Sequence, residues 1–168
     1  MIKRIGALFL LLASVSGVTA MELSHPSTKT LWRPFHFDGS GFSPGTATGT
    51  ATVLLRDGYL PFIQVNGESP RDERLPEGAG AMAGFCYLQA AGGKLQEKSG
   101  YLPMMGVAVT LRGGAGQVAA TTGGGGFFVI ALSPGEYEVQ AAGFARKVTV
   151  EKGKTSLIAI RGGKRMVD

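Results

Sequence analysis

Short segments that alternate apolar and polar residues, separated by tight turns, fill the chain from residue 81 to residue 160. Residues 107–111 and 128–132 show this period of two most clearly, and such a period is typical of a strand with one buried face. Short strands at regular intervals predict an all-β sandwich. Seven are expected, over 83–89, 107–111, 117–121, 128–132, 137–141, 148–150 and 155–160.

Glycine strengthens this prediction, because 27 of the 168 residues are glycine, about twice the usual share of roughly 7%. Glycine disfavours long helices and permits many turns. No segment of helical length interrupts the strand pattern, which argues against alternating strand–helix units.

The chain changes character near residue 80. Residues 22–50 show no sustained period, and we expect them to be extended or irregular. Two strands of a hairpin over 51–66 are predicted next, because Asp57-Gly58 between them is a strong two-residue turn signal. Residues up to 80 form a polar linker. The expected organisation is an N-terminal arm with a hairpin over 21–80 and a sandwich over 81–168.

The first twenty residues have the three parts of a secretory signal peptide. Lys3 and Arg4 supply the positive charge, residues 5–13 are apolar, and small residues precede a cleavage site after Ala20. A membrane anchor is the competing interpretation, but a span needs about 20 apolar residues, and polar residues interrupt this run from Ser14 onward. We therefore expect an exported mature chain without a transmembrane anchor, in the periplasm, at the cell surface or outside the cell.

The net charge argues against a nucleic-acid partner, but an acidic partner or a membrane surface stays possible. Removal of Lys3 and Arg4 with the signal peptide lowers the net charge from +5 to +3, which is too mild to indicate nucleic acid. The late basic residues could form a solvated sheet face and tail, or a patch for an acidic partner or a membrane surface. They are Arg146, Lys147, Lys152, Lys154, Arg161, Lys164 and Arg165.

Cys86 is the only cysteine, so the exported chain has no internal disulfide. It lies in the apolar run 83–88, where a free cysteine behaves as a small buried hydrophobic residue. An intermolecular bridge or a reactive thiol is the alternative.

Two segments resemble a known family. Residues 103–111, Pro-Met-Met-Gly-Val-Ala-Val-Thr-Leu, resemble the opening of carboxypeptidase regulatory-like domains. Residues 126–139, with Leu132, Pro134, Gly135 and Tyr137, resemble their "L-x-P-G-x-Y" centre. The resemblance covers residues 83–160 and implies a seven-strand, transthyretin-like Greek-key sandwich. It implies no activity, because these domains occur attached to many proteins, and it says nothing of residues 21–80.

Two apparent catalytic motifs do not meet their chemical requirements. Residues 41–45 match G-x-S-x-G, but Pro44 follows Ser43 and has no N–H to donate to an oxyanion. Residues 153–155 look like the end of a phosphate-binding loop, but Val148 occupies the place of its first glycine.

No metal, cofactor or catalytic residue is predicted. His25, His36 and Asp38 have spacings that fit no established metal site. Glu136 and Glu138 are two residues apart on one strand, so they share its solvated face rather than opposing each other across a cleft.

Four aromatic residues close together in the sequence are the candidate contact residues: Trp32, Phe35, Phe37 and Phe42. They could anchor the N-terminal arm on the sandwich, or stack on sugar rings if they are exposed and rigidly held. The favoured function is an exported, non-enzymatic binding or structural module of the cell envelope or exterior. It would act through contacts with an unidentified protein or with further copies of itself. The alternative is a carbohydrate-binding accessory domain that uses the aromatic residues of 32–42.

Overall fold

The computed structural model describes residues 31–92, 99–114 and 116–167, and over these residues the chain forms strands and turns without a helix. The predicted all-β class is confirmed. The signal peptide, Ala20 and His25 lie outside the described residues. The strands are β1 (Arg33–Phe37), β2 (Phe42–Pro44), β3 (Thr52–Leu55), β4 (Phe62–Gln64), β5 (Gly80–Gly92), β6 (Ser99–Pro103), β7 (Ala108–Gly113), β8 (Gly116–Thr121), β9 (Phe127–Leu132), β10 (Gly135–Ala141), β11 (Phe144–Val150) and β12 (Thr155–Val167).

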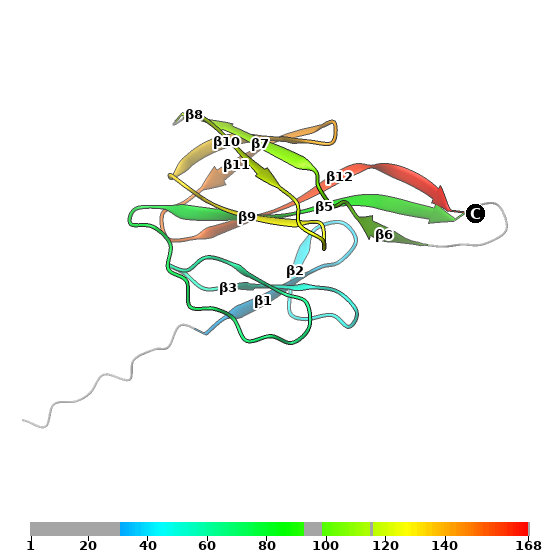
Figure 1. The fold of residues 1–168 in the computed structure, drawn as a ribbon, viewed down its shortest axis with the longest axis horizontal. Helices are drawn as coiled ribbons and strands as arrows, with labels where there is room; N and C mark the ends of the chain where they lie inside the picture. Colours follow the sequence, from blue (N-terminus) through cyan, green and yellow to red (C-terminus); the bar gives the residue numbers. More distant parts are fainter. Residues whose placement is uncertain (1–30, 93–98, 115, 168) are drawn as a thin grey trace, which may run out of the picture.

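The strands form three stacked sheets (Figure 1). The upper sheet has the order β11-β10-β7-β8, and the middle sheet runs β12-β5-β9, with β6 beside the far half of β5. The lower sheet has the order β2-β1-β3-β4. In the upper sheet β7 lies beside β10, although β8 and β9 separate them in sequence. This crossing between the upper and middle sheets is the connection pattern of a Greek-key sandwich.

β5 is buried on both faces, which explains its composition. Met82 and Cys86 belong to the upper core, with side chains of β7, β10 and β12, whereas Ala83, Phe85 and Tyr87 contact the lower sheet. A strand covered on both faces has a continuous apolar sequence rather than an alternating one. Residues 81–87 fit this description, and all seven are buried. The expected burial of Cys86 is therefore confirmed.

The middle sheet extends beyond the sandwich as a three-stranded ribbon (Figure 1). β12 runs parallel to β5 from Thr155 opposite Ala81 to Val167 opposite Gly92, with a register shift between Arg161 and Lys164. β6 pairs with the outer half of β5. The sequence pattern predicts a loop over 90–103 and a last strand that ends at 160, so both predictions are corrected. Gly92 and Gly100 hide the strand pattern within residues 90–103, and the bulge at Gly162-Gly163 interrupts the strand pattern of β12 after residue 160.

The N-terminal region is also more ordered than its sequence predicts, because β1 and β2 lie within the segment expected to be irregular. Strands of five and three residues are too short for a period to show, and packing against β5 stabilises them. β3 and β4 form the predicted antiparallel pair. The turn at Asp57-Gly58 is present, but Tyr59 then bridges to Arg74, so the two strands are joined by the longer connection 56–61.

Candidate functional site: two sides of the stacked sheets

Three of the four candidate aromatic residues lie between the middle and lower sheets. Phe37 is 2% exposed, and its ring centroid lies 4.8 Å from that of Phe85 and 4.6 Å from that of Tyr87. Phe35 and Phe42 pack around the same interface and are half-buried. These contacts attach the lower sheet to the sandwich, and Phe37 has almost no surface to offer a ligand.

Trp32 lies apart from the other three. Its ring meets the edge of Tyr59 at a centroid distance of 6.0 Å, and the Arg56 guanidinium stacks 4.0 Å above the Tyr59 ring. Arg56 also donates to Asp72 at 3.1 Å. Trp32 and Tyr59 are half-buried. Among the four candidates, Trp32 therefore belongs to a separate aromatic and cationic patch on the surface.

Ser43 is arranged for a turn rather than for nucleophilic attack. Its hydroxyl donates to Asp38 Oδ2 at 2.6 Å, and the amides of Ser40 and Gly41 donate to Asp38 Oδ1. These hydrogen bonds, that of Ser43 foremost, hold the pKa of Asp38 well below its usual value. A carboxylate with a lowered pKa is a poor general base. His36 Nδ1 instead faces the Gly45 carbonyl at 3.2 Å, so Ser43 has no histidine base in this turn.

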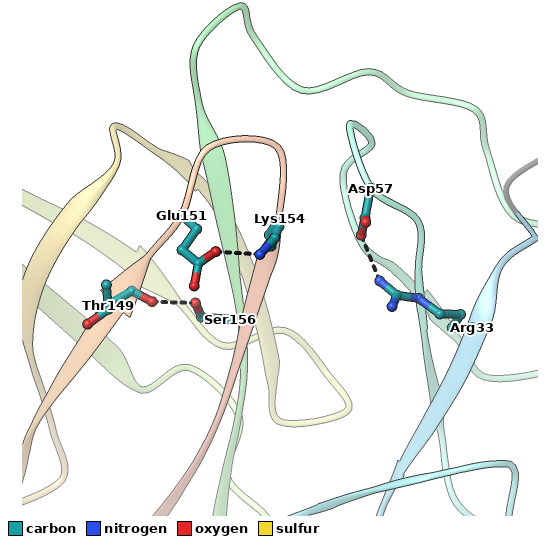
Figure 2. A network of polar contacts seen from close by, with 6 residues as sticks. All are labelled: Arg33, Asp57, Thr149, Glu151, Lys154 and Ser156. Carbon is teal, nitrogen blue, oxygen red and sulfur yellow. Dashed lines mark hydrogen bonds and ion pairs between the residues drawn. The ribbon is translucent and has the colours of Figure 1, made fainter.

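Lys154 belongs to the tight turn between β11 and β12 (Figure 2). Its ammonium group pairs with Glu151 at 2.5 Å, and this hydrogen bond raises the pKa of Lys154. Ser156 donates to the Thr149 carbonyl across the same turn. Because the segment joins two strands, it lacks the helix N-terminus that a phosphate-binding loop requires.

The remaining side chains offer little for chemistry in the part of the chain that the structure describes. Within it, no group of three or more His, Cys, Asp or Glu side chains could hold a metal ion. Burial raises the pKa of Cys86 to about 11, so its thiol stays protonated near neutral pH. Glu136 and Glu138 lie on the outer face of β10, on the opposite side from buried Tyr137 and Val139. No described helix is both long and apolar enough to cross a membrane.

The sheet edges show a clear asymmetry. β11, β12 and β2 gather at one side, around a hollow lined by residues 40–42, 146–148 and 157–159. Each of these edge strands carries a residue that discourages pairing with another strand. They are Arg146 and Lys147 in β11, Arg161 in β12 and Pro44 in β2. We name this the guarded side.

At the opposite ends lie β8 in the upper sheet and β4 in the lower sheet. In the middle sheet this end is formed by β9 and, along the outer half of β5, by β6, which ends in Pro103. We name β8, β9 and β4 the open side. Their sequences are Gly-Gln-Val-Ala-Ala-Thr, Phe-Phe-Val-Ile-Ala-Leu and Phe-Ile-Gln, without a charged residue or a proline. Among the described strands, β8 pairs with β7 alone, β9 with β5 alone and β4 with β3 alone. Edges of this kind are templates for pairing with another chain.

The backbone of β9 shows what the open side presents. The Gly126 carbonyl accepts from Cys86 on the β5 side, whereas the Phe127 carbonyl accepts from Gly123 on the outer side. Because antiparallel ladders alternate, the N–H and C=O groups of Val129 and Ala131 point away from β5. Apolar side chains are exposed nearby, since Val118 in β8 is 40% exposed and Val65, directly after β4, is 64% exposed.

Comparisons with known proteins give little further information. No family model matches the sequence, and no curated protein sequence matches it. Among solved structures the chain is similar to the minor pilin of the Gram-positive pathogen Streptococcus agalactiae, at 16% identity and a TM-score of 0.41. The match covers 76% of this chain and 69% of the pilin chain. We draw no functional conclusion from a likeness at this level, and membership of the carboxypeptidase regulatory-like family stays a prediction.

Sequence reasoning alone did not find the open side. The absence of charge in residues 116–121 and 127–132 is visible in the sequence. Which strands lie at the ends of sheets is set by the topology, and no local pattern reveals it. The late basic cluster was visible too, but its contribution to guarding β11 and β12 depends on the same topology.

Proposed function

We propose that the protein is an exported, non-enzymatic module that binds other protein chains through the strand edges of its open side. The observation that carries this proposal is the contrast between the two sides. Proteins whose sheet edges have no partner protect those edges with charges or proline. Among the described strands, such residues lie in β11, β12, β2 and, as Pro103, in β6, but not in β8, β9 or β4. Export rests on the signal-peptide pattern of residues 1–20.

The mode of binding follows from the edge geometry. An extended segment of another chain would add a strand to β8 or β9, with backbone hydrogen bonds for affinity and neighbouring side chains for specificity. The edge of β9 is recessed, because all six of its residues are buried or half-buried. β8 is more accessible, since five of its six residues are exposed. We therefore place the principal contact at β8.

Photo-crosslinking in the producing cells tests this proposal. A photo-reactive amino acid would replace Val118 on the open side, and Ala145, exposed on β11, would be the matched control position. The expected result is a discrete crosslinked protein species at position 118 and none at position 145. Equal labelling at both positions, or none at either, would contradict the proposal.

Export is tested separately, by locating the protein in cell fractions and by identifying its N-terminal residue. Mass spectrometry of the protein recovered from cell fractions should show a mature N-terminus at Met21, outside the cytoplasm. A cytoplasmic protein that retains Met1 would rule out the exported part of the proposal without affecting the contact surface.

A second candidate is a carbohydrate-binding accessory domain, favoured by the Trp32–Tyr59 patch. Two aromatic rings are half-buried there beside the Arg56 guanidinium, and aromatic faces are the usual platform for a ring-shaped ligand. Glycan-array binding that is lost in Trp32→Ala would support this candidate. Binding that survives the substitution would exclude Trp32 from the site.

A further inference from the structure

We infer that the chain that occupies the β8 edge is a second copy of this protein, paired antiparallel about a two-fold axis at Val118. This inference rests on the proposed function and names its partner. It joins the upper sheets of two copies into one continuous sheet, in which β8 of one copy lies beside β8 of the other.

The backbone of β8 has the hydrogen-bonding pattern that this pairing needs. The Thr122 amide donates to the Val107 carbonyl at 3.0 Å, at the start of the β7–β8 ladder. Alternation along an antiparallel ladder then directs the N–H and C=O groups of Gln117, Ala119 and Thr121 away from β7. With Val118 on the two-fold axis, Gln117 of one copy faces Ala119 of the second copy. Both residues present their outward backbone groups at this position, so they can exchange two hydrogen bonds.

Side-chain charges also permit this arrangement. Cross-strand neighbours on the outer face of the upper sheet follow from the registers of β11, β10, β7 and β8. Across the new interface one row would contain Lys147, Glu138, Arg112 and Gln117 of one copy, followed by Ala119, Thr110, Gln140 and Ala145 of the second copy. No like charges become neighbours in this row. The same operation at β11 would place Arg146 and Lys147 of two copies against each other, which is unfavourable.

Val118 supplies the apolar contact at the centre. It lies on the inner face of the upper sheet, in register with buried Leu111, yet it is 40% exposed because β8 is the edge. On a two-fold axis its side chain would meet its own symmetry mate. Directly opposed side chains are the closest cross-strand neighbours and contribute most to pairing. The exposed Val118 side chain of one copy would therefore gain an apolar contact with Val118 of the second copy.

The first experiment measures the oligomeric state of the mature chain by sedimentation equilibrium. The wild-type protein is expected to be a concentration-dependent dimer. Val118→Lys places two like charges at the axis and should raise the dimer dissociation constant at least about tenfold. Ala145→Lys on the guarded side is the matched control and should leave the dimer unchanged. Circular dichroism checks that each variant is folded. A monomeric wild-type protein would overturn the inference.

The second experiment tests the register by disulfide formation. Val118→Cys brings two thiols together at the axis, at a Cα separation that a disulfide accepts, so mild oxidation should give a covalent dimer. Thr121→Cys lies three residues from the axis and should not crosslink. Cys86 is buried and is the only native cysteine, so it does not interfere. Equal crosslinking of both variants would overturn the two-fold pairing at Val118.

The outcomes separate this inference from the proposed function. A monomeric wild-type protein whose photo-reactive residue at position 118 captures a different protein overturns the second copy as partner and leaves the proposed function standing. Loss of labelling at position 118 together with a monomeric protein overturns both. A dimer that crosslinks through Val118→Cys supports both.

Discussion

The middle sheet is buried on both faces, but its two interfaces are built from different side chains. Against the upper sheet it packs a distributed core of twelve buried residues, mostly aliphatic and drawn from β5, β7, β9, β10, β11 and β12. Against the lower sheet it packs two smaller clusters. One consists of aromatic rings around Phe37, which contacts Phe85, Tyr87 and Tyr101, and the other is built around Val53, Leu55 and Ala83. The upper interface is one core of many residues, whereas the lower one is divided, and its aromatic half is centred on a single ring.

Through these clusters the described part of the N-terminal region packs on the middle sheet as a third layer. Phe37 comes from β1, and it covers rings of the middle sheet that would otherwise face water. Deletion of residues 21–50 would therefore remove two strands of the lower sheet and expose an aromatic surface. Substitutions at single residues are the better way to test the comparison.

The largest effect is expected for Phe37→Ala. Removal of a buried phenylalanine costs about 3–5 kcal/mol of the free energy of unfolding, and this ring is the centre of the aromatic cluster in the lower interface. Urea denaturation followed by fluorescence and by circular dichroism measures the loss. Leu31→Ala is the control, because Leu31 is 78% exposed, and it should change stability by no more than about 0.5 kcal/mol. A loss below about 1 kcal/mol for Phe37→Ala would contradict the central place of this ring in the aromatic cluster.

Gly84→Ala tests the upper interface from within β5. A methyl group at this position would overlap the ring of Phe128, and the contact is with a buried side chain rather than a flexible surface one. Overpacking of this kind costs up to about 3 kcal/mol. Gly100→Ala, in β6 of the ribbon, is the matched control, because a methyl group there meets no neighbouring atom. If both variants were equally stable, the close approach of Phe128 to β5 would be wrong.

Alkaline pH should weaken both interfaces, because an acidic side chain is buried in the upper core and another is half-buried in the lower aromatic cluster. Burial raises the pKa of Cys86 in the upper core from 9.0 to about 11, and burial also raises the pKa of Tyr101 in the lower cluster. The unfolded chain therefore loses these protons first, so stability falls as pH rises above about 9. For Cys86 the loss by pH 11 is on the order of 2 kcal/mol.

Thermal melts between neutral pH and pH 11 measure this effect. Cys86→Ala should flatten the part of the curve that begins near the ordinary thiol pKa of 9.0, and Tyr101→Phe should flatten the part that begins near the ordinary phenol pKa of 10.0. A melting temperature of the wild-type protein that does not change with pH would contradict the burial assigned to Cys86 and Tyr101.

The smallest effect is expected for Arg33→Ala, which removes a charge contact rather than packing. Arg33 pairs with Asp57 at 2.6 Å (Figure 2), but both side chains are more than half exposed. Exposed pairs of this kind contribute at most about 1 kcal/mol, and salt weakens them further. Denaturation at low and high salt measures the contribution. This pair joins β1 to the connection after β3 within the lower sheet, so a loss comparable to that of Phe37→Ala would contradict the small contribution expected of it.

Local patterns predicted much of the sandwich. Alternation in residues 107–111 and 128–132 placed six side chains on the inner face. Four of them, Val109, Leu111, Phe128 and Leu132, are buried, and Val107 and Ile130 are half-buried against the same core. The turn at residues 133–135 was likewise marked by Pro134 and Gly135. Such features depend on neighbours close in sequence, which is why a sequence pattern reveals them.

Features that depend on distant segments were not predictable in the same way. The continuous apolar run 81–87 signals a strand covered on both faces, but the covering layer is the short strands of the N-terminal region, which have no period of their own. For the candidate site the same limit applies. The composition of β8 is plain in the sequence, yet its position at the end of a sheet depends on the crossings between β7 and β10.

The parallel pairing of β12 with β5 has a consequence for the order of folding. The ladder joins Ala81 to Thr155 and Gly92 to Val167, so the central strand cannot gain this neighbour until residues 155–167 have been synthesised. Contacts between residues so distant in sequence slow folding, because a long loop must close before the ladder forms. During that interval the apolar surface of β5 is available to chaperones and to other unfolded chains. The middle sheet is therefore expected to remain incomplete in the nascent protein until β12 has been synthesised.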